Sequence, residues 1–202
     1  GIFYLDTYRT QLLNERYKLA RIGAQITAEA LAGATRAREE ALLIQIGKEQ
    51  RMRLRIFNPE GVLSADSFAL DDPSFELTFD ENKTPTEQLA MVLDEALDAI
   101  VGAAPVPDYY EPENSSADAW PELRRAREEG ISQIQLREAP DGTPVINAAA
   151  PLGIQGSTLL TTRNAVDITE SVRAARSFLG MAVLLVLFAS ILLSLFLART
   201  II

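Results

Sequence analysis

The feature that most constrains this chain is an uninterrupted apolar run near its end. Between Arg176 and Arg199 the sequence contains no charged residue and no proline. A helix of this length, at about 1.5 Å per residue, spans the roughly 30 Å hydrocarbon core of a bilayer. A buried globular helix normally keeps a polar face, whereas within residues 178–198 only Ser190 and Ser194 carry polar side chains. We therefore predict a transmembrane helix in contact with membrane lipid at residues 177–198. Its representative residues are Phe178, Leu184, Phe188, Leu192 and Ala198.

The rest of the chain is acidic and lacks two reactive residue types. All 28 Asp and Glu residues precede the apolar run, as do 18 of the 19 Lys and Arg residues, and an acidic surface repels nucleic acid. The absence of cysteine and histidine excludes disulfides, the usual zinc sites and Ser-His-Asp catalysis. A carboxylate site for Ca²⁺ or Mg²⁺ is disfavoured because no Asp-x-Asp-x-Asp-Gly loop is present. We expect no catalytic residue, cofactor, metal site or nucleic-acid partner in this chain.

The first part of the sequence predicts a long helix followed by a hairpin. Apolar residues recur at intervals of three, four and seven across residues 5–26, which predicts a helix with an apolar stripe. Glu15 interrupts this stripe, so the stripe faces either its own domain or a second copy of the chain. Residues 53–57 alternate in polarity, 58–61 favour a turn and 62–67 are extended, which predicts a β-hairpin. The stripe consists of Leu5, Tyr8, Leu12, Leu19, Ile22 and Ile26.

Shorter helices are predicted from capping residues and spacing. Residues 41–46 favour a short helix. The sequence Thr-Pro-Thr-Glu at 84–87 combines a capping residue with proline at the first helical position, and the apolar spacing over 89–100 predicts an amphipathic helix. Residues 121–129 form a charged helix that Gly130 ends.

Three further strands complete the predicted core. Ile134 and Leu136 alternate with polar residues, and residues 145–150 and 157–163 are extended segments that follow turns. With the hairpin, this makes about five antiparallel strands, with one or two helices packed on a face. The predicted fold class is α+β.

The last helix is predicted to enter the membrane without a joint. Residues 167–170, Asp-Ile-Thr-Glu, read as a capping box, and no proline or glycine separates them from Leu179. Two packed helices that leave one domain side by side can transmit a domain shift as a nearly rigid movement.

This order of parts resembles the extracytoplasmic sensor region of a bacterial membrane receptor with a PAS-like or Cache-like core. Three strings, at residues 54–67, 145–152 and 193–201, are similar to the ChvG/ExoS class of alphaproteobacterial sensor histidine kinases. The resemblance implies the end of a preceding transmembrane helix at 1–4 and a periplasmic sensor domain at 5–176. It also implies a HAMP linker that starts at 199–202. Residues 69–83 and the acidic insert 105–118 depart from the pattern of the class.

The same resemblance implies a bacterial inner-membrane protein that works as a homodimer. A kinase region outside this chain would use ATP and Mg²⁺ and would pass phosphate to a cytoplasmic response regulator, whereas this segment itself is non-catalytic. The class responds to envelope or acid conditions under restraint by a periplasmic repressor protein with Sel1-type repeats. Two other functions stay open: the ligand-binding domain of a chemoreceptor and a membrane-tethered periplasmic protein without signalling output. The residues that follow Ile202 would discriminate among the three.

Two groups of residues are candidates for the site that receives the signal. Because histidine is absent, a direct acid response requires carboxylates whose pKa is raised from about 4 by burial or crowding; a solvated acidic loop is the competing interpretation. Aromatic residues beside the acidic insert either form an exposed partner-binding face or cap the sheet, and the second is favoured. Arginines on the 121–129 helix bind a carboxylate or, as favoured, form a solvated face. The candidates are Asp66, Asp71, Asp72, Asp80 and Glu81 for sensing, Tyr109, Tyr110 and Trp120 for the partner, and Arg124, Arg125 and Arg127 for a carboxylate.

Overall fold

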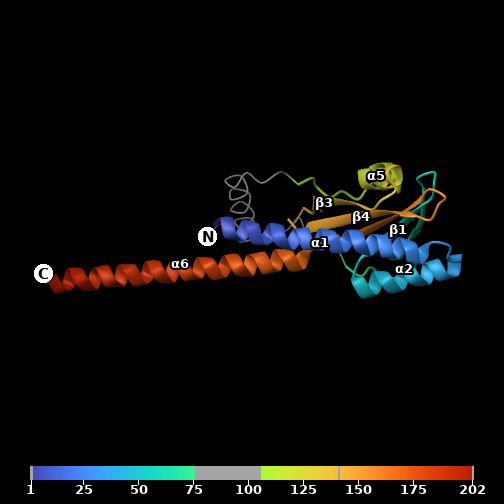
Figure 1. The fold of residues 1–202 in the computed structure, drawn as a ribbon. Helices are drawn as coiled ribbons and strands as arrows, with labels where there is room; N and C mark the ends of the chain where they lie inside the picture. The colour runs from blue at the N-terminus through green and yellow to red at the C-terminus, as the bar shows by residue number, and fades with distance from the viewer. Residues whose placement is uncertain (1, 76–105, 141, 202) are drawn as a thin grey trace.

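A five-stranded antiparallel sheet lies between two layers of helix and connecting chain (Figure 1). The computed structural model describes residues 2–75, 106–140 and 142–201. Helices α1 (Ile2–Leu31) and α2 (Arg36–Gln50) cover one face of the sheet, and α5 (Pro121–Glu129) covers the other. The sheet therefore has a helix on each side, and its two faces are built from different side chains.

The strand order places the last strand at the centre of the sheet. The strands are β1 (Arg53–Phe57), β2 (Leu63–Asp66), β3 (Gln133–Glu138), β4 (Pro144–Leu152) and β5 (Ser157–Asn164). Their order is β2-β1-β5-β4-β3, and each neighbouring pair is antiparallel. The β1–β2 turn needs Gly61 because its φ of 81° lies in the left-handed region. The predicted hairpin and the five antiparallel strands of an α+β fold are confirmed.

Small side chains allow α1 to lie close to the sheet. Ala24 and Ala28 of α1 are buried in one cluster with Ala148 and Ala150 of β4, and Leu159 of β5 belongs to the same cluster. Residues at alternate positions of a strand share a face, so this face of β4 is apolar, whereas β5 adds Leu159 together with Thr161 and Arg163, which pair with Ala148 and Ile146. The core on this side is a close contact between helix and sheet.

A capping residue determines where helix α2 begins, and a glycine allows it to lie close to β1. The Thr35 hydroxyl accepts a hydrogen bond from the Arg38 amide at its start. A Cβ at Gly47 would lie 3.2 Å from the Met52 carbonyl oxygen, so this position brings α2 close to β1. The helix has 15 residues and is longer than the short helix predicted over 41–46, because its exposed charged turns carry no apolar signal.

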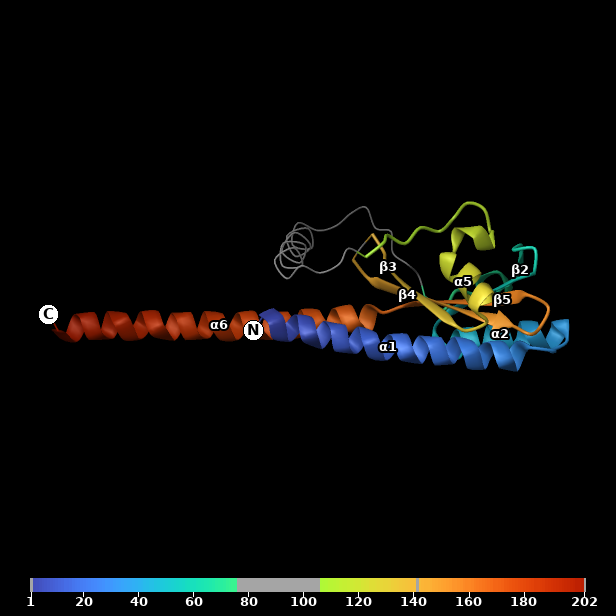
Figure 2. The ribbon, with the colours of Figure 1, turned by 45° about the horizontal axis from the view of Figure 1, so that its top comes forward.

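The central strand continues almost directly into the last helix. Only Ala165, which is buried and donates its amide to the Pro144 carbonyl at 2.8 Å, separates β5 from α6 (Val166–Ile201). Helix α6 then runs beside the first half of α1 and continues beyond it, so α6 extends away from the domain at the end where the chain starts (Figures 1 and 2). The predicted long exit helix is confirmed as one continuous helix.

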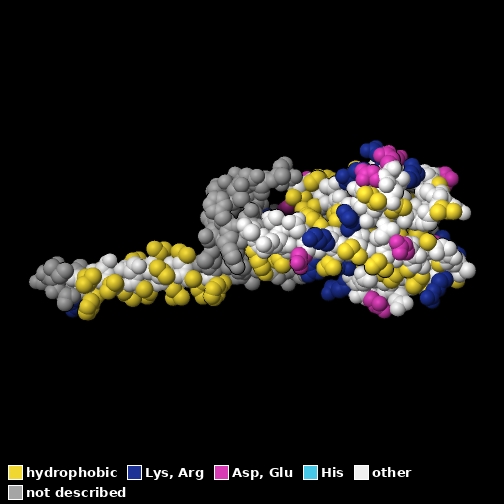
Figure 3. Space-filling view, in the orientation of Figure 1, with side chains coloured by type: hydrophobic (Ala, Val, Ile, Leu, Met, Phe, Trp, Pro, Cys, Tyr) yellow, Lys and Arg dark blue, Asp and Glu magenta, His cyan; other side chains and the backbone are white. Residues whose placement is uncertain are grey.

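Helix α6 carries hydrophobic side chains along the part that extends past the domain (Figure 3). Phe178, Leu184, Phe188 and Leu192 are all more than half exposed. Within the part of the chain that the structure describes, no helix combines the length and the hydropathy needed to cross a membrane. The transmembrane helix at 177–198 stays a prediction.

One part of the apolar stripe of α1 packs against the sheet, and the other part is exposed. Leu12 packs against the sheet with Leu13 and Tyr17, whereas Leu19, Ile22 and Ile26 are 59%, 55% and 60% exposed. The second half of the stripe therefore does not face its own domain. Helix α3 (Ser67–Leu70) was not predicted, because four residues are too few to show a period. The predicted amphipathic helix at 84–100 lies outside the described residues.

Candidate functional site

A row of polar side chains crosses the face of the sheet that α5 covers. Arg53 pairs with Thr162, Thr162 pairs with Asn147, and Asn147 pairs with Gln135. Directly paired residues project to the same face of a sheet, so this row runs over four strands. Arg55, two positions beyond Arg53 on β1, lies on the same face. A polar row inside a covered sheet face is costly unless its groups find partners.

An extended segment, residues 106–116, crosses the same face and is called the strap here. At the β3 edge, the Tyr109 amide donates to the Glu138 carbonyl at 2.7 Å, and the Glu138 amide donates to the Pro107 carbonyl at 2.9 Å. At the β2 edge, the Leu63 amide donates to the Ser115 carbonyl at 3.4 Å. Backbone hydrogen bonds thus attach the strap at both edges of the sheet.

The middle of the strap is held by the carboxylate of Glu111. Its Oε1 accepts from Arg55 Nη1 at 2.8 Å and lies 3.1 Å from Arg53 Nη1, and its Oε2 accepts from the Tyr109 hydroxyl at 2.7 Å. Arg53 also makes a two-point contact with Asp66, at 3.0 and 2.6 Å. Charge-assisted hydrogen bonds are the strong class of hydrogen bond, so these contacts with Arg53, Arg55 and Tyr109 determine where the Glu111 carboxylate lies.

A second ion pair lies deeper under α5. Arg137 Nη1 and Nη2 donate to the two carboxylate oxygens of Glu122 at 2.6 and 2.9 Å, and Asn147 Nδ2 donates to Glu122 Oε1 at 3.0 Å. Glu122 is fully buried. The Trp120 ring links this pair to the first group, because Arg55 Cζ and Arg137 Cζ lie 4.7 and 5.1 Å from the ring centroid. Cation–π contacts of desolvated arginines are worth up to about 2 kcal/mol.

Three buried polar atoms of this cluster have no hydrogen-bond partner among the residues that the structure describes. They are Arg55 Nε, Trp120 Nε1 and Asn147 Oδ1. Native proteins leave few buried polar groups unpaired, and each one requires an explanation, such as a bound water or ion, strain or a functional role. The cluster on the α5 face is therefore the candidate functional site.

The protonation of the cluster is set by opposing effects. Burial disfavours the Arg53 cation, but hydrogen bonding to Asp66 and the charges of Glu111 and Asp66 outweigh it, so the pKa of Arg53 is raised. Burial also raises the pKa of Tyr109 to about 12, and Arg55 opposes this rise. Tyr109 is therefore a neutral hydroxyl donor to Glu111 at physiological pH.

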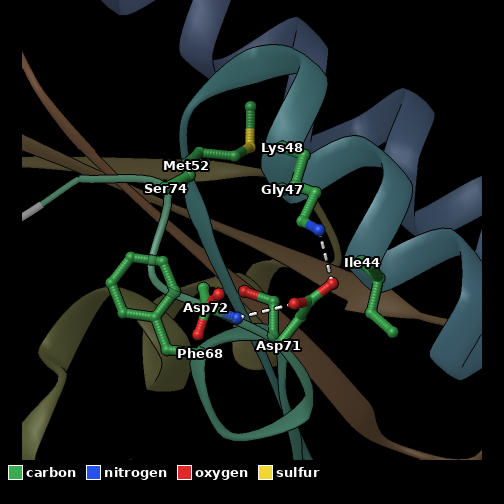
Figure 4. A pocket seen from close by; sticks show the side chains of 9 residues that line it. Ile44, Gly47, Lys48, Met52, Phe68, Asp71, Asp72 and Ser74 are labelled. Atoms are coloured by element: carbon green, nitrogen blue, oxygen red, sulfur yellow. Dashed lines mark hydrogen bonds and ion pairs between the residues drawn. The ribbon is translucent and has the colours of Figure 1, made fainter.

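Another polar group lies between α2 and α3 (Figure 4). Lys48 Nζ lies 2.6 Å from Asp71 Oδ2, and the Asp72 amide donates to Asp71 Oδ1 at 2.8 Å. The Lys48 ammonium holds the pKa of the Asp71 carboxyl below its usual range. The hypothesis of a raised pKa is therefore wrong for Asp71. The hollow beside these residues, lined also by Phe68 and Ser74, has room for about one water molecule.

The structure does not gather the predicted sensing carboxylates into one site. Asp66 pairs with Arg53 and caps α3 by accepting from the Phe68 amide at 3.0 Å. Asp71 pairs instead with Lys48, on another element. Asp80 and Glu81 lie outside the described residues. Asp66 and Asp71 therefore take part in two separate ion pairs.

The predicted aromatic residues differ in exposure. Tyr109 and Trp120 are buried, with ring centroids 5.9 Å apart, and only Tyr110 is exposed. This placement differs from an exposed partner-binding face and agrees with aromatic residues that cap the sheet. Of the three arginines of α5, Arg125 is half-buried and donates to Gln135, whereas Arg124 and Arg127 are exposed.

Most residues of the cluster were not predicted from the sequence. The available signal was the alternation of Arg53 and Arg55 with apolar residues in a strand, which the hairpin prediction used only for secondary structure. Nothing in the local sequence pairs them with Glu111, because 56 positions separate Arg55 from that residue. The residues missed are Arg53, Arg55, Glu111, Glu122, Arg137 and Asn147.

Comparison with known proteins points to one family. The stimulus-sensing domain family matches residues 35–142, which include α2, the strap and α5. The sequence has no match among curated proteins. Among solved structures, the PAS domain of an HTR-like protein from Haloarcula marismortui is 13% identical, with 63% of this chain and 89% of that chain covered and a TM-score of 0.24.

Proposed function

The chain belongs to the family of stimulus-sensing domains, and from this membership we propose that it is the extracytoplasmic sensor and transmembrane signalling segment of a two-component sensor histidine kinase. The family match over residues 35–142 carries the proposal. In this proposal the domain receives an envelope or acid signal, α6 transmits it, and a kinase region uses ATP and Mg²⁺ to phosphorylate a response regulator. This segment itself binds no nucleotide.

The junction between β5 and α6 supports the proposal that a signal passes from the sheet to the last helix. One buried residue, Ala165, connects the central strand to the helix, so a shift of β5 must move the start of α6. Arg55 of the cluster donates to the Thr162 hydroxyl of β5 at 3.1 Å. A change in the cluster therefore has a short path of direct contacts to α6, and packed helices move nearly rigidly.

The exposed side chains of α6 support a membrane location. Phe178 and Leu184 are among the large hydrophobic residues of this helix that are more than half exposed, and lipid would cover such a surface. Arg199 follows the apolar run, and a positive charge beyond a span favours the cytoplasmic side. We place the sensor domain in the periplasm and α6 in the bacterial inner membrane.

The exposed half of the α1 stripe supports a homodimer. Leu19, Ile22 and Ile26 follow the spacing of a helical seam. A Cβ added at Gly23, beside them, would meet no atom of the described residues within 4 Å, so the surface there is open. Such a seam suits a parallel helix pair with a second copy. A periplasmic repressor with Sel1-type repeats is a further proposed partner, with Tyr110 as an exposed aromatic residue for it.

An insertion series tests transmission. Residues 1–202 are fused, behind an added first span, to the HAMP linker and kinase core of a characterised sensor kinase. One to four alanines inserted after Ala165 rotate α6 by about 100° each relative to the sheet. Kinase output should vary with the number inserted and return towards the starting level at four. Matched insertions in the 153–156 turn should leave output unchanged, and equal output from every insertion would overturn the proposal.

Labelling of the native parent protein with radioactive ATP tests the kinase assignment. Membrane vesicles should yield an acid-labile phosphohistidine in that protein. A parent protein without ATP-dependent histidine phosphorylation would support the chemoreceptor alternative, because the sensor architecture would then serve another output.

A further inference from the structure

The carboxylate of Glu111 accepts hydrogen bonds from converging donors, as the carboxylate of a bound ligand would. Three donor groups from two elements, Arg53 and Arg55 of β1 and Tyr109 of the strap, converge on its two oxygens at 2.7 to 3.1 Å. The Glu111 side chain is 40% exposed, whereas that of Arg55 is 3% exposed. The donors are thus buried and fixed, while the acceptor reaches them from the surface.

The attachment of the strap makes Glu111 the replaceable part. Backbone hydrogen bonds hold the strap near Tyr109 and near Ser115, but in the described part of the chain none fixes residues 110–113. The Glu111 side chain joins this middle stretch to Arg55 and Arg53 of the sheet. Its carboxylate can therefore leave the site without breaking either edge attachment.

The donors would still require an anion after Glu111 left. Among the described residues, Arg55 would keep only the neutral Thr162 hydroxyl as a hydrogen-bond partner, and a buried charge without a counter-ion is strongly unfavourable. Arg53 would keep Asp66, so the unbalanced charge would be that of Arg55. The Nε of Arg55 is buried and already without a partner among the described residues, so the site has a donor beyond those that Glu111 uses.

We propose that Arg53, Arg55 and Tyr109 form a binding site for the carboxylate group of a small solute, and that Glu111 is its resident intramolecular ligand. The solute displaces Glu111, frees the middle of the strap and takes over the two arginines. Two guanidinium groups match a planar carboxylate. The signalling consequence rests on the proposed sensor function: Arg55 also contacts Thr162 of β5, which leads through Ala165 to α6.

A titration with acetate tests the site in the full 202-residue chain in detergent micelles near neutral pH. Trp120 is the single tryptophan, and its ring lies 4.7 Å from Arg55 Cζ, so its fluorescence reports on the site. Sodium chloride at equal ionic strength gives the baseline. Glu111→Gln removes the competing charge with little change in shape, and Glu113→Gln changes an exposed glutamate of the same strap as a matched control.

The Glu111→Gln variant should bind acetate at least about tenfold more tightly than the wild-type chain, because a tethered competitor acts at an effective concentration in the millimolar range. Glu113→Gln should match the wild type, and Glu111→Gln combined with Arg55→Met should lose saturable binding. Equal acetate responses from the two Gln variants would overturn the proposal, as would binding that survives the loss of Arg55.

Glu111→Asp keeps the inference testable if Glu111→Gln does not fold. The shorter side chain keeps the charge but reaches the arginines less well, so acetate should bind more tightly than to the wild type; unchanged affinity would overturn the site. These titrations contain no kinase. If acetate does not bind but kinase output varies along the alanine insertion series, the carboxylate site alone is rejected. If acetate binds as expected but kinase output stays constant along the insertion series, the sensor function alone is rejected.

Discussion

Replacement of Arg137 by methionine tests the buried ion pair under α5. The substitution keeps an apolar stem of similar length but leaves the carboxylate of Glu122 without a counter-ion at a fully buried position. The variant loses two charge-assisted hydrogen bonds, of 2.6 and 2.9 Å. It also loses the contact of the guanidinium with the Trp120 ring.

The expected loss of unfolding free energy is about 3–5 kcal/mol, the usual cost of stranding one charge of a buried pair. This figure already includes the two lost hydrogen bonds, and its main part is the cost of leaving the buried Glu122 charge uncompensated. A double variant with Glu122→Met and Arg137→Met should lose less than the single variant, because no charge is stranded. The double variant still leaves the Asn147 amide without its acceptor, which costs about 1–3 kcal/mol.

Urea unfolding of the full chain in mild detergent, followed by Trp120 fluorescence, measures these free energies. Arg124→Met changes an exposed arginine of α5 and should stay within about 0.5 kcal/mol of the wild type. The reasoning is refuted if Arg137→Met costs no more than Arg124→Met. It is also refuted if the double variant is less stable than the single one, since a stranded charge would then not be the main cost.

Two further predictions follow from pKa shifts. Lys48 lowers the pKa of Asp71, so this pair stabilises the fold above the unfolded-state pKa and its contribution is lost as pH falls through the lowered value. In urea unfolding, Asp71→Asn should differ from the wild type near neutral pH and converge with it below about pH 4; a difference that grows on acidification would contradict this sign. Burial raises the pKa of Tyr109 to about 12, so Tyr109→Phe should remove the last phase of an ultraviolet titration of tyrosinate. Tyr110→Phe serves as control, and an unchanged last phase in Tyr109→Phe would contradict the burial argument.

Elements with local signals could be predicted from the sequence. The α5 helix was predicted with its bounds, because Pro121 at its first position and Gly130 after its end are local signals. The hairpin followed likewise from alternation on both sides of a turn. The extent of α2 was underestimated because helical charged turns on the surface have no apolar period to reveal them.

The candidate site could not be predicted in the same way. Arg55 meets Glu111 and Thr162 across separations of 56 and 107 positions. Such pairs depend on strand register and on the path of the strap, and neither leaves a mark in the neighbouring sequence. The acidic residues that stood out by local crowding, such as Asp71, form ion pairs with residues of other elements instead.

The sequence by itself determined the order of the elements, the α+β class and the apolar character of the last helix, since capping, turn chemistry and hydrophobic period act over a few residues. Only the tertiary structure decided that β5 is the central strand joined by Ala165 to α6, and that Leu19 and Ile26 of α1 face outward. It alone brought the buried charges together on the α5 face. The physical reason is that these arrangements depend on long-range packing, in which each side chain is placed by partners from distant parts of the chain.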